Sequence, residues 1–128
     1  MDLNTVVVMQ LHGAMNGKML VTEAENYFDA GARNLILDMS GLTFISSYGL
    51  SALHHIALMY RGEGKSAFRE DRSAVDDMHQ ERKRGFHIQE HVKLLNPSDA
   101  IRDVLDIVGF TAFFEFYKDL ESAVASFH

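Results

Sequence analysis

Short apolar runs alternate with amphipathic helical patterns along most of the chain, and this alternation restricts the fold more than any other feature. Strands that alternate with helices favour a largely parallel sheet joined by right-handed crossovers. Continuous apolar or β-branched runs predict strands at residues 5–11, 34–38, 91–95 and 111–117. Apolar residues at spacings of three and four predict helices at residues 18–30, 47–60, 99–108 and 119–127. The predicted fold is therefore α/β, a single domain over residues 1–128 in which about four helices pack on a mostly parallel sheet of four to five strands.

One charged segment interrupts the alternation before the third strand. Residues 61–85 hold 13 of the 30 charged side chains, with a net charge of +1. Ser73 as a cap and Gly85 as a stop predict a helix between them, but this helix has few apolar residues to bury. We therefore interpret residues 65–90 as a charged, partly helical insert in the domain.

The composition argues against several classes of function. The chain has no cysteine, which excludes disulfides, thiol catalysis and thiolate metal sites. A net charge of −6 argues against a surface that binds nucleic acid. No apolar run approaches the roughly 20 residues that a membrane span needs, and no signal peptide is visible. We expect a cytoplasmic protein that neither binds nucleic acid nor inserts into a membrane.

Residues 34–53 contain the best candidate for a functional site. A buried strand is predicted to end at Asp38. A second, largely apolar segment follows at residues 42–45, and the next helix is predicted to begin near Ser46 and Ser47. The loop between a strand and a helix N-terminus is where α/β proteins place many of their working residues.

The same stretch resembles the STAS domain, the family of sulfate-transporter and anti-sigma-factor-antagonist domains. The hallmark of that family is a strand ending in Asp-Leu-Ser, a hydrophobic step, and then Asp-Ser-Ser-Gly-Leu opening a helix. In this chain the strand ends in Asp38-Met39-Ser40, and the helix opens with Ser46-Ser47-Tyr48-Gly49-Leu50. The resemblance continues at residues 94–98, 104–105 and 108–110, so it covers most of the chain outside residues 65–90.

The resemblance implies a signalling protein that works by binding, with no cofactor. In phosphorylated members of the family, a partner serine kinase that is also an anti-sigma factor modifies the serine corresponding to Ser47. The unmodified form binds the kinase and frees the sigma factor, and a phosphatase resets the modified form. The implied partner-binding residues are Asp38, Ser46, Ser47, Tyr48 and Gly49, with Ser47 as the phosphoacceptor and Ser46 as its competitor. A homodimer is left open.

Each of these residues also has a purely structural interpretation. Ser47 or Ser46 could cap the helix, since a serine at this position accepts a hydrogen bond from a free backbone N–H. Asp38 could brace the turn at Ser40 through an Asx-type hydrogen bond, which we favour over contact with a partner. Gly49 would allow the close approach of backbone or partner, and Tyr48 is either an exposed interface aromatic or a half-buried loop residue.

Other chemistries have weaker support in the sequence. His87 and His91 are four residues apart, a spacing that suits two metal ligands on a helix, but residues 91–95 have the pattern of a strand, so we expect no metal site. The chain has no Gly-x-Ser-x-Gly elbow and no phosphate-binding Gly-x-x-x-x-Gly-Lys loop, so we expect no enzyme. The alternative function is a STAS domain without phosphorylation, acting as a scaffold, an oligomer subunit or a small-ligand sensor. Ser46 in place of the hallmark aspartate, and Tyr48 in place of a small residue, favour that alternative.

Overall fold

The computed structural model describes residues 5–62 and 89–127. Most of the predicted insert, including the helix expected between Ser73 and Gly85, therefore lies outside the described residues. The strand after the insert begins at Gln89, two residues earlier than the predicted start at His91. Gln89 is fully buried, and its side-chain amide donates a hydrogen bond to the carbonyl oxygen of Ala57 at 2.6 Å. The strand thus begins with a polar residue that the hydrophobic pattern could not identify.

The four strands form one parallel sheet in chain order, as the alternating sequence predicts. They are β1 (Val6–Ala14), β2 (Asn34–Phe44), β3 (Gln89–Leu95) and β4 (Phe114–Tyr117), and each pairs with the next in parallel. Right-handed crossovers between successive neighbours place every connecting helix on the same face of such a sheet.

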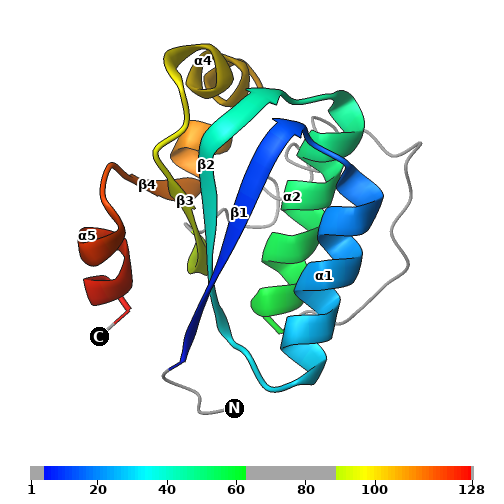
Figure 1. Cartoon of the computed structure of the whole chain (residues 1–128), viewed down its shortest axis with the longest axis vertical. Helices are drawn as coiled ribbons and strands as arrows, with labels where there is room; N and C mark the ends of the chain where they lie inside the picture. The colour runs from blue at the N-terminus through cyan, green and yellow to red at the C-terminus, as the bar shows by residue number, and fades with distance from the viewer. Residues whose placement is uncertain (1–4, 63–88, 128) are drawn as a thin grey trace.

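The helices follow that rule. α1 (Gly17–Asp29) and α2 (Ser47–Tyr60) lie side by side against one face of the sheet (Figure 1). Residues of α4 (Asp99–Ile107) join the same hydrophobic core, whereas α5 (Leu120–Ala125) packs in a separate small cluster. The face opposite α1 and α2 is therefore the one that α5 contacts.

β2 is buried on both faces, which explains its continuous apolar sequence. Leu35, Leu37 and Met39 point into the main core beneath α1 and α2, and all three are fully buried. Ile36 points the other way, toward Leu95 and the α5 residue Ala123. A central strand with both faces covered has no need for polar alternation.

Two strand boundaries differ from the prediction. β2 does not end at Asp38 but continues to Phe44, because β1 remains paired with it up to Ala14 through two register shifts. The predicted strand at residues 111–117 begins only at Phe114. Residues Phe110–Ala112 instead form a 3₁₀ turn (η1) after Gly109, which adopts a left-handed φ of 87°. Phe110 and Phe113 are fully buried, so hydrophobicity there reflects core packing and not strand formation.

Candidate functional site

The connection from β2 to α2 is organised by Ser46, which caps the helix. Its backbone is extended, with φ −88° and ψ 172°, and its Oγ accepts a hydrogen bond from the Gly49 N–H at 3.2 Å. Its carbonyl oxygen accepts the first helical bond, from the Leu50 N–H at 3.0 Å. Of the two adjacent serines, Ser46 is therefore the cap, and the alternative in which Ser47 caps the helix was wrong.

Ser47 is the first residue of α2, and its side chain is exposed. The structure gives its hydroxyl no hydrogen bond to any of the residues described. Backbone N–H groups at the start of a helix lack intrahelical partners, and the helix dipole is positive at this end. The first turn of α2 contains no acidic residue. An anionic group on the Ser47 oxygen would thus meet a favourable local field.

Asp38 has an internal role, as the structural interpretation predicts. Its Oδ1 accepts hydrogen bonds from the Ser40 N–H at 3.0 Å and from the Ser40 hydroxyl at 2.8 Å. The strand runs on from Asp38 to Phe44, a contour of about 20 Å at roughly 3.3 Å per residue. The resemblance groups Asp38 with Ser47 as partner-binding residues, but the structure separates the two along a strand and gives no contact between them.

Gly49 is buried, and it allows α2 to start close to the strands. A Cβ at this position would lie 2.9 Å from the Ile45 Cγ1 and 3.0 Å from the Met15 Sδ. The sequence predicted that backbone or a partner would approach Gly49 closely. The groups that approach it are side chains of this chain, so Gly49 shapes the site from inside.

A second glycine, Gly17, lies where the first turns of the two long helices meet. A Cβ on Gly17 would lie 2.9 Å from the Tyr48 carbonyl oxygen and 3.3 Å from the Ala52 Cβ. Asn16 caps α1 by accepting a hydrogen bond from the Met19 N–H at 3.1 Å. The Asn16-Gly17 pair thus starts α1 and lets its backbone contact α2 beside Ser47.

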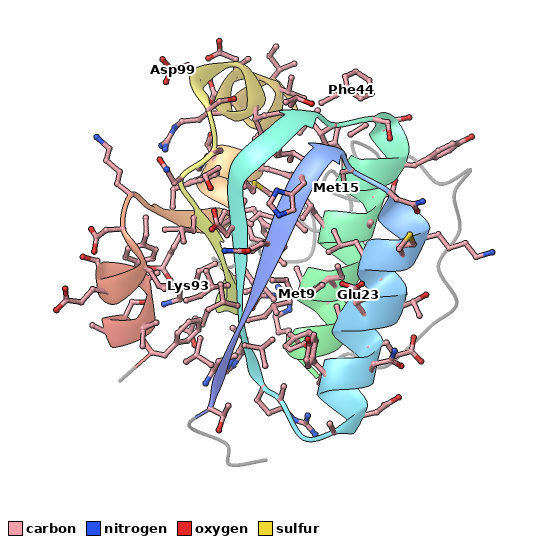
Figure 2. The ribbon with its side chains drawn as sticks, viewed as in Figure 1. Met9, Met15, Glu23, Phe44, Lys93 and Asp99 are labelled. Atoms are coloured by element: carbon pink, nitrogen blue, oxygen red, sulfur yellow. The ribbon has the colours of Figure 1, made fainter. Side chains whose placement is uncertain are left out.

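Three exposed apolar side chains lie on the segments that meet at this end, and we refer to them as the apolar patch. Met19 is 60% exposed, Phe44 59% and Tyr48 50%. Figure 2 shows Phe44 at the end of β2, projecting away from the core. Of the three, the sequence singled out only Tyr48, because nothing in the local pattern shows that Phe44 passes the end of the packed sheet. Grouped exposed apolar side chains are typical of protein-binding surfaces.

The histidines and the helices give no further candidate. His91 lies in β3, as its sequence context predicts, and its Nδ1 is 3.1 Å from the Asn34 Oδ1; His87 lies outside the described residues. Within residues 5–62 and 89–127, no group of three or more metal-ligating side chains is close enough to hold an ion. No helix in this part of the chain is long and apolar enough to cross a membrane.

The fold is similar to that of a solved structure. The chain is similar to the solved structure of the anti-sigma factor antagonist SpoIIAA in its unphosphorylated form, with a TM-score of 0.50 and 19% sequence identity over 98% of this chain and 91% of that one. No protein-family model matches the sequence, and no curated protein is similar to it in sequence. The similarity confirms the STAS-like fold predicted from the residues around Asp38 and Ser47.

Proposed function

We propose that this protein is a cytoplasmic signalling module that acts by binding, in the manner of an anti-sigma-factor antagonist, and that a partner serine kinase switches it by phosphorylating Ser47. The observation that carries the proposal is that two adjacent serines have different environments. The hydroxyl of Ser46 is engaged in the helix cap, while that of Ser47 is exposed at the start of the same helix. The similarity to SpoIIAA supports the same class of role.

A phosphate on Ser47 would act on binding and leave the fold in place. It adds a charge of about −1.5 to −2 at neutral pH. The start of α2 stabilises that charge through its free N–H groups and its dipole. The same charge stands beside the apolar patch, where a partner must remove water from Phe44 and Tyr48. Burying a phosphate there is costly, so modification releases the partner.

The neighbours of Ser47 define what the kinase must accept. Tyr48 directly follows the acceptor and is half exposed, and Ser46 stands before it without a charge. A kinase that modifies Ser47 therefore needs an apolar pocket for a tyrosine ring, and it cannot depend on an acidic residue before the acceptor.

A second candidate function is a STAS-like scaffold or oligomer subunit that is never phosphorylated. The apolar patch favours this function, because exposed Met19, Phe44 and Tyr48 also suit a permanent interface. In that case the patch is covered at all times, and one arrangement that covers it is a homodimer.

The test is phosphorylation mapping on protein isolated from its native cells, together with the Ser47→Ala, Ser46→Ala and Ser40→Ala variants. We expect phosphate on Ser47 in the wild type and in both other variants, and none after Ser47→Ala. Ser40 serves as the control because it is also an exposed serine, bonded to Asp38. Phosphate found only on other residues, or none under any growth condition, would remove the switch. A dimer that Tyr48→Ser dissociates would then favour the scaffold.

A further inference from the structure

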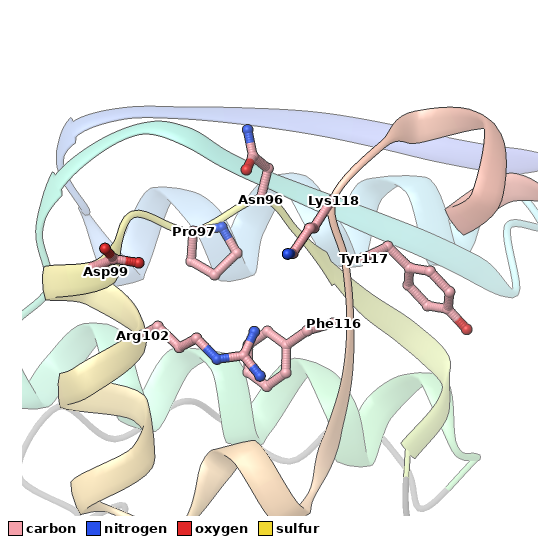
Figure 3. A pocket seen from close by; sticks show the side chains of 7 residues that line it. All are labelled: Asn96, Pro97, Asp99, Arg102, Phe116, Tyr117 and Lys118. Carbon is pink, nitrogen blue, oxygen red and sulfur yellow. The ribbon is translucent and has the colours of Figure 1, made fainter.

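A pocket of about 530 Å³ opens at the carboxyl ends of β3 and β4, and no residue of the apolar patch lines it (Figure 3). The turn after β3 contributes Asn96, the first turns of α4 contribute Asp99 and Arg102, and the end of β4 contributes Phe116, Tyr117 and Lys118. This volume lies within the range of about 300–1,000 Å³ that is usual for small-molecule sites. Neither of the proposed functions uses the pocket.

The backbone holds the pocket open through Asn96. Its N–H donates a hydrogen bond to the Tyr117 carbonyl oxygen at 2.7 Å, which joins the ends of β3 and β4. Its φ of 50° lies in the left-handed region, which only a few residue types, asparagine among them, adopt readily. The chain therefore turns sharply away from the sheet, and α4 starts at a distance from β4.

Two cationic side chains from different elements face this space. The guanidinium carbon of Arg102 lies 4.5 Å from the centre of the Phe116 ring, a cation–π contact that orients the group. Lys118 extends from the end of β4 toward the same space, as Figure 3 shows. Among the described residues, no carboxylate lies within ion-pair distance of either cation. In this view the Pro97 ring lies between the Asp99 carboxylate and the Lys118 ammonium.

This arrangement is unusual on an acidic protein. The whole chain carries a net charge of −6, yet two cations line this pocket against one carboxylate, that of Asp99, which forms an ion pair with neither of them. Like charges that share one pocket repel each other, and a bound anion removes that repulsion. The first turn of α4 already carries the Asp99 carboxylate, which offsets the positive end of the helix dipole, so the two cationic side chains are the groups that attract an anion.

We propose that this pocket binds a small organic phosphate monoester. The planar guanidinium of Arg102 matches two phosphate oxygens, and the Lys118 ammonium supplies the second positive charge that a dianion requires. Phe116 offers ring surface to the organic part of the ligand, whereas the Tyr117 ring lies on the opposite face of the sheet, with Lys93 and the α5 cluster. Asp99 can accept a hydrogen bond from a hydroxyl at the rim.

The test is a nuclear magnetic resonance titration of the ¹⁵N-labelled full chain with phenyl phosphate, inorganic phosphate and benzoate. We expect saturable amide shifts at Asn96, Arg102 and Lys118, with a Kd on the order of 1 mM for phenyl phosphate. Inorganic phosphate lacks a group that can contact the Phe116 ring, and benzoate carries one charge, so each should bind several-fold more weakly. Arg102→Gln and Lys118→Gln should each weaken phenyl phosphate binding by about tenfold.

Lys18→Gln is the matched control, because Lys18 is an exposed lysine on α1 that does not line the pocket, and it should leave binding unchanged. Arg102 and Lys118 are also exposed, so the amide spectra should show that both variants stay folded. Absence of saturable shifts, or equal binding by wild type and both variants, would overturn the proposal. Benzoate binding as tightly as phenyl phosphate would overturn the assignment to phosphate monoesters.

Discussion

The Tyr48 carbonyl oxygen occupies the space that a side chain on Gly17 would need, 2.9 Å from the position of its Cβ. This contact sets α1 against α2 in the turn that carries Ser47. The obstructing atom belongs to the backbone, so it cannot move aside as the end of a flexible side chain could.

Gly17→Ala should therefore destabilise the protein, although alanine is the better helix former. We expect the free energy of unfolding, measured with urea, to fall by about 1–3 kcal/mol, the usual effect of overpacking a close contact. Lys18→Ala is the control, because it places alanine at an exposed position in the same helical turn. A gain in stability with Gly17→Ala would show that the two first turns can separate freely.

Substitution of the two adjacent serines should have different effects on stability. Ser46→Ala removes the cap of α2 and should lower the free energy of unfolding by about 1 kcal/mol. Ser47→Ala removes a hydroxyl with no hydrogen bond to any of the residues described, so its unfolding midpoint should match the wild type. Thermal and urea unfolding of both variants measure the difference. Equal losses in the two variants would mean that the hydroxyls share the cap.

Lys93 should be needed to hold α5 on the sheet. It is buried in β3, and its Nζ lies 3.1 Å from the Glu115 Oε2 and 2.9 Å from the Ser126 Oγ. It also lies 4.5 Å from the centre of the Phe127 ring. Lys93→Ala removes this ion pair and hydrogen bond, so it should lower the free energy of unfolding by about 2 kcal/mol. The loss should stay moderate because the Glu115 carboxylate remains partly hydrated without its partner.

The effect of Lys93→Ala should be local to the end of the chain. Hydrogen exchange should speed up at the Val124 and Ser126 amides while that of Leu37, in the centre of β2, changes little. Lys18→Ala again gives the baseline for removing an exposed lysine. Uniform acceleration across the sheet would show that α5 and the core unfold as one unit.

Alkaline pH should destabilise the protein through Tyr60. This residue is buried, and its hydroxyl donates a hydrogen bond to the Ala24 carbonyl oxygen at 2.7 Å. Burial raises the pKa of Tyr60 far above its usual range. The folded state then keeps the proton at a pH where the unfolded state has lost it. Stability is therefore fully present below about pH 10 and decreases as the pH rises through the unfolded pKa.

Urea unfolding between neutral pH and pH 11 measures how steeply the free energy of unfolding falls with pH, which we call the alkaline slope. Tyr60→Phe should lower stability at neutral pH by about 1 kcal/mol through the lost hydrogen bond, and it should make the alkaline slope shallower. Tyr48→Phe, at an exposed tyrosine, should leave the slope as in the wild type. An unchanged slope in Tyr60→Phe would assign the alkaline effect to other groups.

The periodicity of the sequence was sufficient to predict the order of the elements, but local pattern could not place every boundary. Asp38 interrupts the apolar run, so the strand was expected to end there. Its continuation to Phe44 depends on pairing with β1 through register shifts, and such non-local pairing leaves no local signal. The hydrophobic residue Phe113 likewise suggested a strand, whereas it is buried in the core at the end of a 3₁₀ turn.

At the candidate site, residue types were predicted better than their roles. The sequence identified Ser46, Ser47 and Gly49, because cap and close-approach residues are recognisable at a helix start. It could not decide which serine caps, since that depends on the backbone angles of Ser46. Met19 and Phe44 were missed, because exposure of an apolar residue depends on where the neighbouring elements stop.

The cap at Ser46 also has an evolutionary consequence. The helix cap depends on residue 46, whereas the hydroxyl of residue 47 has no hydrogen bond to the described residues, so under the proposed function selection would act on residue 47 mainly through regulation. A lineage can exchange Ser47 for threonine, for a permanently charged aspartate or for an inert alanine without first acquiring a compensating stabilising change. If Ser47 is the proposed switch, descendants of this domain can gain, fix or lose it in single steps while the fold stays the same.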